Sequence, residues 1–237
     1  MFKLLFAYSR RGLLHYISHL DMLRLFQRAL RRAAIDVAYS KGYNPHMQLS
    51  LSIPLTMGVK AKKEYGEVTL GKKMAADNFI CTLNPQLPED LCLVSAKDNF
   101  IDKGTLASSI TAALYTASII MVKDDSKFTA ELEKNINKLL SLDSLVISKK
   151  GKKGVKEVNI RPYILAMNIK TNNFSDLPVI SMLLQTGSHG GVSPLVVIDQ
   201  LALLFGDDNL MHLNWMFERE ELYIGQDDNM QPLSKRM

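Results

Sequence analysis

The apolar pattern at the start of the chain predicts a strand followed by an amphipathic helix. The compact apolar run over residues 2–8 is typical of a strand. Ser18 precedes the helical pattern and Asp21 stands three residues later, which is the Asp variant of a capping box. The predicted buried stripe of this helix has helical spacing and consists of Leu20, Leu23, Phe26, Ala29, Leu30 and Ala33.

The runs that follow complete a first structural unit. They predict strands over residues 35–39, 47–55, 64–70 and 91–96 and a helix over residues 75–83. The order of elements is then strand, helix, strand, strand, helix, strand. This is the order of the ferredoxin-like split βαβ plan, in which two helices cover one face of an antiparallel sheet.

A similar plan follows a polar linker. Its elements are strands over residues 114–122, 145–148, 155–160, 164–169, 179–185 and 211–217 and helices over residues 128–142 and 193–205. We therefore expect an α+β protein of two ferredoxin-like (βαββαβ) units in tandem, with antiparallel sheets and helices on one face. The predicted domains are residues 1–100 and 110–225, and residues 226–237 are expected to form a disordered tail.

Charge is distributed unevenly along the 237 residues, whose formal net charge is +5. Residues 1–73 hold thirteen Lys/Arg and four Asp/Glu, and residues 145–170 hold seven Lys/Arg and one Glu. The end of the chain, residues 206–237, is acidic, with three basic and seven acidic residues. Two basic segments favour a polyanionic partner such as RNA, with no DNA specificity expected. The alternative is an ordinary solvated surface.

The chain contains two cysteines, Cys81 and Cys92, which do not have the spacing of a metal site or a disulfide framework. We therefore expect no metal, no iron–sulfur cluster and no other cofactor in this chain. No stretch approaches the length of a membrane span, and the first residues do not form a signal peptide. The simplest interpretation is a cytoplasmic protein that does not interact with membranes.

Basic residues of the first helix are the first candidate site. Arg24 and Arg28 stack along one side, with Arg31 or Arg32 continuing the row. The planar guanidinium suits phosphate and can stack on bases. The predicted nucleic-acid-binding residues of this half are Arg10, Arg11, Arg24, Arg28, Arg31, Arg32, Tyr43 and Asn44. The alternative is a solvated helix face with ion pairs.

Four residues form a conditional acid–base site, which requires that the fold bring them together: His19, Asp21, His46 and Glu64. His19 stands at the positive end of the helix dipole, which disfavours its protonated form. His46 ends the loop Gly42-Tyr43-Asn44-Pro45-His46, in which Gly allows a positive φ and Tyr43 offers a stacking face. The alternatives are a capping cluster at the helix start and a plain turn.

The second half offers two weaker signals. Lys156 and Arg161 place positive charge around a strand end and are predicted to contact nucleic acid. A glycine-rich loop before the last predicted helix can hold an anion through its backbone N–H groups, and its candidate residues are Gly187, Ser188, Gly190 and Gly191. A flexible turn explains this loop equally well, because it lacks both the phosphate-loop and the dinucleotide glycine spacing.

These motifs together resemble the radical-SAM-linked protein family. The residues that carry the resemblance are Tyr8-Ser9, Gly12, Ser18-His19-Leu20-Asp21, Arg24, Arg28–Ala33, Tyr39-Ser40, Gly42–His46, Gly58 and Glu64-Tyr65. The family is a bacterial domain of unknown function, fused to cobalamin-binding-type radical SAM proteins or encoded beside them. Its members usually carry Phe where this chain has Tyr43, and often Asp where it has Asn159. The resemblance implies a radical SAM partner more firmly than a reaction.

Three functions remain open from the sequence. The first is an accessory RNA-binding module that works with a radical SAM partner, in tRNA or rRNA modification. The second is an RNA-processing or RNA-modifying enzyme in its own right, using the conditional acid–base site. The third is a protein–protein docking domain for the radical SAM enzyme. We favour a non-catalytic accessory subunit.

Overall fold

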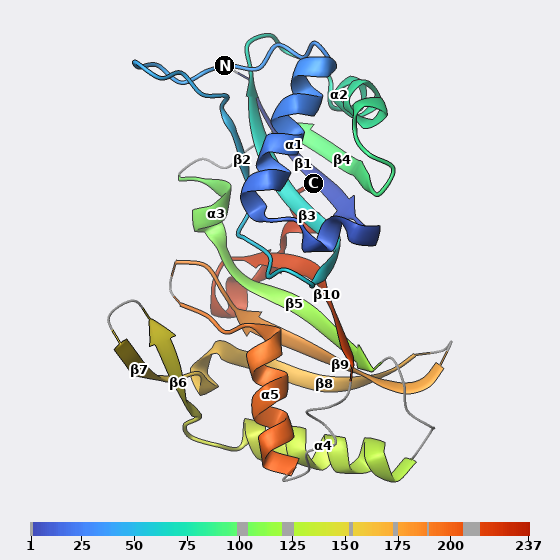
Figure 1. Ribbon diagram of the computed structural model, residues 1–237, viewed down its shortest axis with the longest axis vertical. Coiled ribbons are helices and arrows are strands. Elements are labelled where there is room, and N and C mark those ends of the chain that lie inside the picture. Colours follow the sequence, from blue (N-terminus) through green and yellow to red (C-terminus); the bar gives the residue numbers. More distant parts are fainter. Residues whose placement is uncertain are drawn as a thin grey trace. The chain divides into compact units, whose positions relative to one another are not determined.

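A computed structural model describes residues 2–98, 104–119, 126–151, 154–172, 175–188, 190–205 and 214–237. The chain divides into two compact units (Figure 1). Unit 1 combines Met1–Thr111 with Arg219–Met237, and unit 2 is Ala112–Glu218. The end of the chain therefore belongs to the same unit as its beginning.

The elements of unit 1 agree well with the local pattern. They are β1 (Phe2–Arg10), η1 (Gly12–Tyr16), α1 (His19–Arg32), β2 (Leu49–Leu51), β3 (Lys60–Leu70), α2 (Ala76–Leu83), η2 (Asn84–Gln86), β4 (Leu91–Asp98), α3 (Leu106–Ser109) and the Arg219–Ile224 part of β10 (Trp215–Ile224). The segment predicted as a strand over 35–39 forms only isolated bridges, Val37 with Leu70 and Tyr39 with Met47. The predicted strand over 47–55 shortens to β2.

The prediction of two tandem ferredoxin-like units is wrong. The strands form one nine-stranded mixed sheet, which also includes β5 (Ile110–Ile119), β8 (Ile164–Asn172), β9 (Ser175–Gln185) and β11 (Gln231–Pro232). Its order is β4-β1-β3-β10-β5-β9-β8, with β2 paired to β3 and β11 to β10. Because β10, which comes late in the chain, is hydrogen-bonded to β3, the strands form one sheet and not two. Strand partners depend on contacts between residues far apart in sequence, so local patterns predicted the elements but not their order.

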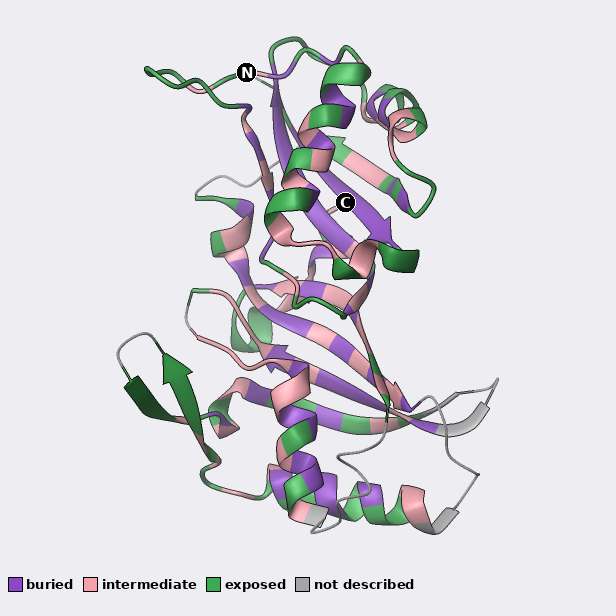
Figure 2. Cartoon of the chain, in the orientation of Figure 1, coloured by how far each residue is buried: buried purple, intermediate pink, exposed green. Residues whose placement is uncertain are grey.

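The core of unit 1 lies between the sheet and helices α1 and α2. Phe6 of β1 packs against Phe26 of α1 and Phe79 of α2, with ring centroids 5.4 and 5.9 Å apart. Gly66 pairs with Phe6 across β1 and β3. A Cβ at position 66 would come within 2.4 Å of the Phe6 ring, so only glycine allows this approach. Figure 2 shows the resulting band of buried residues along β1 and β3.

Helix α1 begins as predicted, and Phe26, Ala29 and Leu30 of its predicted stripe are buried. Ser18 caps it, because its Oγ accepts from the Asp21 N–H at 3.2 Å. Its buried residues are Met22, Phe26, Ala29 and Leu30, whereas the predicted Leu20 is 62% exposed. The predicted face is therefore correct except near the start of the helix, where Met22 is buried and Leu20 is not.

Unit 2 contains the part of β5 (Ile110–Ile119) from Ala112 onward and the part of β10 up to Glu218. Its other elements are α4 (Ser126–Leu140), β6 (Val146–Gly151), β7 (Gly154–Asn159), η3 (Arg161–Tyr163), β8 (Ile164–Asn172), β9 (Ser175–Gln185) and α5 (Pro194–Phe205). Strand β9 pairs antiparallel with both β5 and β8, and α4 contacts β8 and α5. The basic hairpin β6–β7 forms a separate, exposed two-stranded sheet (Figure 2). No helix in the described residues is long and apolar enough to cross a membrane.

The last residues of the chain are held within unit 1. Residues 226–237, expected as a disordered tail, form η4 (Asp227–Asn229), β11 (Gln231–Pro232) and η5 (Leu233–Arg236), and Leu233 is buried.

Strand β10 is fixed to β3 by polar contacts as well as by pairing. Tyr65 donates its hydroxyl to the Glu221 carboxylate, and Lys62 pairs with Glu220 at 2.8 Å.

A buried ion pair is the strongest of these contacts. Arg219 donates through Nε to Glu64 Oε1 at 2.6 Å and through Nη2 to Glu64 Oε2, a bidentate arrangement. Both side chains are almost fully buried. Arg219 Nη2 also reaches the Ile53 carbonyl at 3.2 Å. Arg10 lies close enough for the Glu64 carboxylate to raise its pKa, against the larger effect of burial, which lowers it.

We expect Glu64→Leu to destabilise unit 1 more than Arg219→Met. Glu64→Leu removes the carboxylate that Arg219 is bonded to and leaves two guanidiniums, those of Arg219 and Arg10, in the interior, at a cost of about 3–5 kcal/mol. Arg219→Met leaves the Glu64 carboxylate beside Arg10. Urea denaturation measures both free energies of unfolding. Lys3→Met, which removes a partly exposed pair with Glu67, is the control and should change stability by less than about 1 kcal/mol. Equal losses in the two core variants would contradict this view of the cluster.

Candidate functional site

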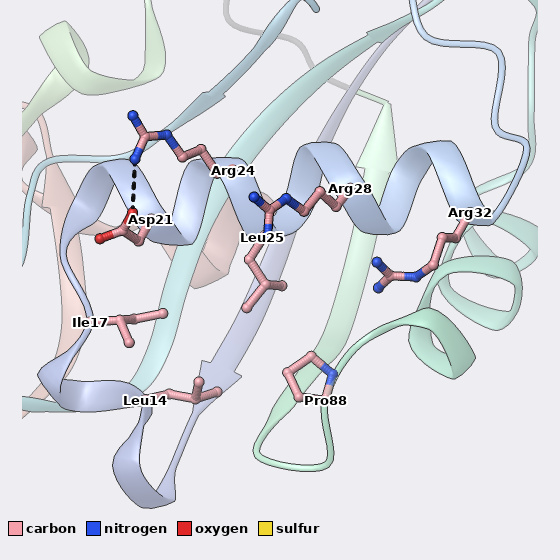
Figure 3. Close-up of a pocket in the computed structure, with 8 residues that line it drawn as sticks. All are labelled: Leu14, Ile17, Asp21, Arg24, Leu25, Arg28, Arg32 and Pro88. Carbon is pink, nitrogen blue, oxygen red and sulfur yellow. Dashed lines mark hydrogen bonds and ion pairs between the residues drawn. The ribbon is translucent and has the colours of Figure 1, made fainter.

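Three arginines of α1 line a groove. Arg24, Arg28 and Arg32 stand four residues apart, so they follow one side of the helix (Figure 3). The groove has a volume of 440 Å³, and its remaining lining residues are Leu14, Ile17, Asp21, Leu25 and Pro88. Figure 3 shows the arginines along the helix and the apolar side chains across from them. The site therefore combines a positive edge with an apolar floor.

The charge of this groove is only partly compensated. Arg24 donates to the Asp21 carboxylate at 3.1 Å, and Ser18 donates to the same carboxylate at 2.7 Å. The hydrogen bond from Ser18, followed by that from Arg24, lowers the pKa of Asp21 below its usual range. Arg32 donates to the Gln86 carbonyl, a neutral acceptor. Arg28 has no hydrogen bond or ion pair within the described part of the chain.

The other predicted arginines of this half occupy different places. Arg31 is exposed but does not line the groove, so the structure selects Arg32 as the third member of the row. Arg11 is exposed after the end of β1, and its backbone N–H bonds the Asp90 carbonyl. Arg10 is only 4% exposed. In this conformation the Arg10 side chain is not on the surface, so it cannot make the predicted contact with nucleic acid.

The conditional acid–base residues are brought together only in part. The Glu64 carboxylate and the guanidiniums of Arg219 and Arg10 all act on the pKa of His19, which places this histidine by the buried ion pair. Burial lowers that pKa below its usual range, and Glu64 opposes the shift. Asp21 is exposed and is bonded to Ser18 and Arg24.

The fourth member, His46, closes a loop. The Ser40 N–H donates to the His46 carbonyl at 2.9 Å, and the His46 N–H donates to Ser40 Oγ at 3.1 Å. Ser40 Oγ also lies 2.9 Å from His46 Nδ1. Between them Tyr43 is fully exposed and Asn44 is exposed. Figure 1 shows the loop between α1 and β2 extending from the sheet as a long arm, so His46 shapes the arm that presents Tyr43.

The two basic candidates of unit 2 differ in their surroundings. Lys156 is exposed on β7 of the basic hairpin. Arg161 donates to the carbonyls of Ile164 at 2.9 Å and Leu140 at 2.6 Å, so its guanidinium connects α4 to the start of β8. The local geometry of Arg161 is that of a structural residue.

The glycine-rich loop leads into α5 as expected. Gly187 and Gly190 have φ angles of +92° and +95°, which favour glycine. A Cβ on Gly191 would come within 2.5 Å of the Gln185 carbonyl oxygen. Ser188 is exposed. Ser193 Oγ accepts from the Leu195 N–H at 3.3 Å, so the chain itself satisfies one of the amides that an anion would use.

Sequence reasoning missed several residues of these sites. Arg219 is a single basic residue within an acidic strand, and nothing in its local pattern indicates a buried partner 155 positions earlier. The floor of the groove comes from η1, the residue after η1, α1 and a residue two positions after η2, so only folding brings it together. Pro88 lies between the helix predicted over residues 75–83 and the strand predicted over residues 91–96.

The fold and the groove define an α+β protein with an arginine-lined groove along one helix. The chain belongs to a family described as uncharacterized and conserved in bacteria, DUF2344, whose sequence profile matches residues 3–194. This supports the expected bacterial family of unknown function, while the radical SAM link stays a prediction. A search of curated proteins finds no match. In the described parts of the chain, no three His, Cys, Asp or Glu side chains gather as a metal site.

The proximity of His19 to Glu64 can be tested by titration. We expect the His19 pKa to fall further in Glu64→Gln, because that variant removes the charge that stabilises the imidazolium. NMR of the imidazole C2–H resonance measures the midpoint. Glu67→Gln is the matched control, since Glu67 bonds Ser50 and does not act on His19. An unchanged or higher midpoint in Glu64→Gln would place the two residues apart.

The sign of the effect on stability follows from the same shift. The folded state holds the His19 pKa below the unfolded value of about 6.5, so the unfolded chain binds the proton more tightly. This histidine therefore reduces the free energy of unfolding as the pH falls through about 6.5.

Proposed function

We propose that this protein is an accessory RNA-binding module that works with a radical SAM partner in tRNA or rRNA modification. The observation that carries the proposal is the groove of Arg24, Arg28 and Arg32. The partner is implied by the resemblance to the radical-SAM-linked family, and the groove offers a surface for the nucleic acid.

The spacing of the arginines suits an extended polyanion. Residues four apart on a helix are separated by about 6 Å along its axis, so the row presents a regular line of positive charge. One carboxylate lies in the groove, and it is bonded to Arg24 and Ser18. A phosphate chain along this row would neutralise the charge that the protein leaves uncompensated.

The groove and, separately, the exposed arm offer apolar and aromatic contacts. Leu14, Leu25 and Pro88 offer a floor on which a ribose or a base edge can rest. Tyr43, fully exposed on its arm, offers a face on which an unpaired base can stack. Contacts of both kinds favour an RNA that exposes single-stranded nucleotides over a uniform duplex.

We expect the triple variant Arg24→Gln/Arg28→Gln/Arg32→Gln to bind bulk tRNA with a salt dependence weaker than that of the wild type. Each phosphate contact contributes about −0.7 to −0.9 to the slope of log K against log salt, so loss of three contacts should make the slope less negative by about 2–3. Fluorescence anisotropy at several salt concentrations measures it.

Arg31→Gln is the matched control, because it removes the same charge from the same helix outside the groove. It should change the slope by less than half as much as each groove arginine does on average. Absence of RNA binding by the wild type at low salt would overturn the proposed function. Equal effects of Arg31 and the groove residues would assign binding to general charge.

An exposed apolar patch favours a docking role beside RNA binding. Leu13 and Met57 are 77% and 64% exposed, and Tyr16 is also exposed. The Gly58 N–H donates to the His15 carbonyl at 2.9 Å, so the loop that carries Met57 is fixed to η1, which carries the other two. Exposed apolar side chains that gather in this way are typical of protein interfaces. We propose this patch as the contact with the radical SAM partner.

We expect the chain to co-purify with a co-expressed radical SAM protein encoded beside it, and the complex to survive nuclease treatment. Leu13→Ser/Met57→Ser should reduce recovery of the partner by about tenfold or more, the loss expected when two interface anchors are truncated. Leu203→Ser, an exposed leucine of α5 in unit 2, is the matched control. A complex that nuclease disperses would mean that RNA alone joins the two proteins.

A further inference from the structure

The β6–β7 hairpin extends from unit 2 as a separate two-stranded sheet (Figure 1). Its described residues are all exposed except Ile147 and Val158, which face each other across the two strands and are half-buried. A two-stranded hairpin that buries so little apolar area adds little to the core of unit 2. Folding therefore places few demands on the side chains of the hairpin, which leaves them available for contact with another molecule.

The base of the hairpin is nevertheless fixed to the rest of unit 2. The Ile160 N–H donates to the Leu145 carbonyl at 2.8 Å, just beyond the last strand pair. Asn159 Oδ1 accepts from the N–H groups of Leu145 and Arg161, at 2.9 and 3.1 Å. The Ile160 side chain is buried. The hairpin is therefore an anchored arm, and its side chains keep a defined arrangement.

One face of this arm carries positive charge without an acidic residue beside it. Lys149 of β6 and Lys156 of β7 are directly opposite each other in the register, so their side chains share a face. Both are exposed. Glu157, the one acidic residue of the hairpin, pairs with Ser148 and therefore lies on the opposite face. Like charges directly opposite each other destabilise a strand pair, so the stability of the hairpin does not explain the two lysines.

Protection of the free strand edges does not explain this arrangement either. Lysines on edge strands discourage pairing with other chains, but for that purpose they can stand anywhere along the strands. Two lysines directly opposite each other add repulsion without adding protection. Lysine is depleted in protein interfaces, whereas it is a common ligand of phosphate. The lysine pair therefore suits a phosphate-bearing polyanion better than a protein surface.

We propose that Lys149 and Lys156 form a second RNA-binding surface, which contacts the phosphate backbone of the RNA that the arginine groove binds. The inference rests on the proposed RNA binding and extends it to unit 2. Two surfaces that bind one RNA raise the overall affinity above that of either surface, because the second contact is intramolecular once the first has formed. The preferred substrate is then an RNA of the size of tRNA and not a short oligonucleotide, because a longer chain has phosphates for both surfaces.

The test measures binding of the full chain to bulk tRNA by fluorescence anisotropy at several salt concentrations. Lys149→Gln/Lys156→Gln should make the slope of log K against log salt less negative by about 1.5, which corresponds to the loss of two phosphate contacts. Lys134→Gln/Lys138→Gln is the matched control, since it removes the same charge from exposed positions of α4 in the same unit. The control should change the slope by less than half as much. Equal effects of the two pairs would assign the contact to general charge and overturn the proposal.

A second variant separates binding from stability. Lys149→Glu places opposite charges across the strand pair, so its Tm should equal or exceed that of the wild type. Its affinity for tRNA should nevertheless be lower than that of Lys149→Gln, because the new carboxylate repels phosphate. Affinity equal to or higher than that of Lys149→Gln would overturn a phosphate contact at this face.

The outcomes separate this inference from the proposed function. An unchanged slope in the double lysine variant, with a weaker slope in the triple groove variant, overturns the hairpin surface and leaves the proposed function standing. A weaker slope in the lysine variant alone supports the hairpin surface and overturns the groove. A wild type that binds no tRNA at low salt overturns both. Loss of the co-expressed radical SAM protein from the nuclease-treated lysine variant would mean that the hairpin faces a protein, which also overturns the inference.

Discussion

The ion pair between Glu64 and Arg219 is the interaction on which the architecture of unit 1 depends. It joins β3 to a strand that lies 155 residues further along the chain, and it does so in the interior, where a single charge is costly. The bidentate geometry requires that β10 take one register beside β3. Tyr65–Glu221 and Lys62–Glu220 reinforce the same register. The last strand is thus specified by polar complementarity as well as by apolar burial.

Helix α1 connects this architecture to the sites. One side, with Met22 and Phe26, packs on the sheet, and another presents the arginines of the groove. Its first turn carries His19, whose pKa is affected by the buried charges of Glu64, Arg219 and Arg10. It also carries Asp21, whose exposed carboxylate accepts a hydrogen bond from Arg24. A change in the packing of this helix would therefore shift the groove and the buried cluster together.

Local pattern was a good guide to the elements and a poor guide to their arrangement. The capped helix, the helix over 76–83 and most strands were foreseen within a few residues, because period and capping are local properties. The buried stripe of α1 was predicted correctly at Phe26, Ala29 and Leu30 and wrongly at Leu20. Of the conditional site, the structure places His19 by Glu64, while Asp21 and His46 have local partners.

The sequence by itself determined the arginine row, the exposed aromatic loop and the bacterial family, because these are contained in short stretches of chain. Tertiary structure alone decided which arginines share a groove, that Arg10 is buried, and that Arg219 completes the cluster around Glu64. The physical reason is the same in each case. Burial and ion pairing depend on which distant segments of the chain come into contact. The spacing of neighbouring residues does not reveal which of these long-range contacts are favourable.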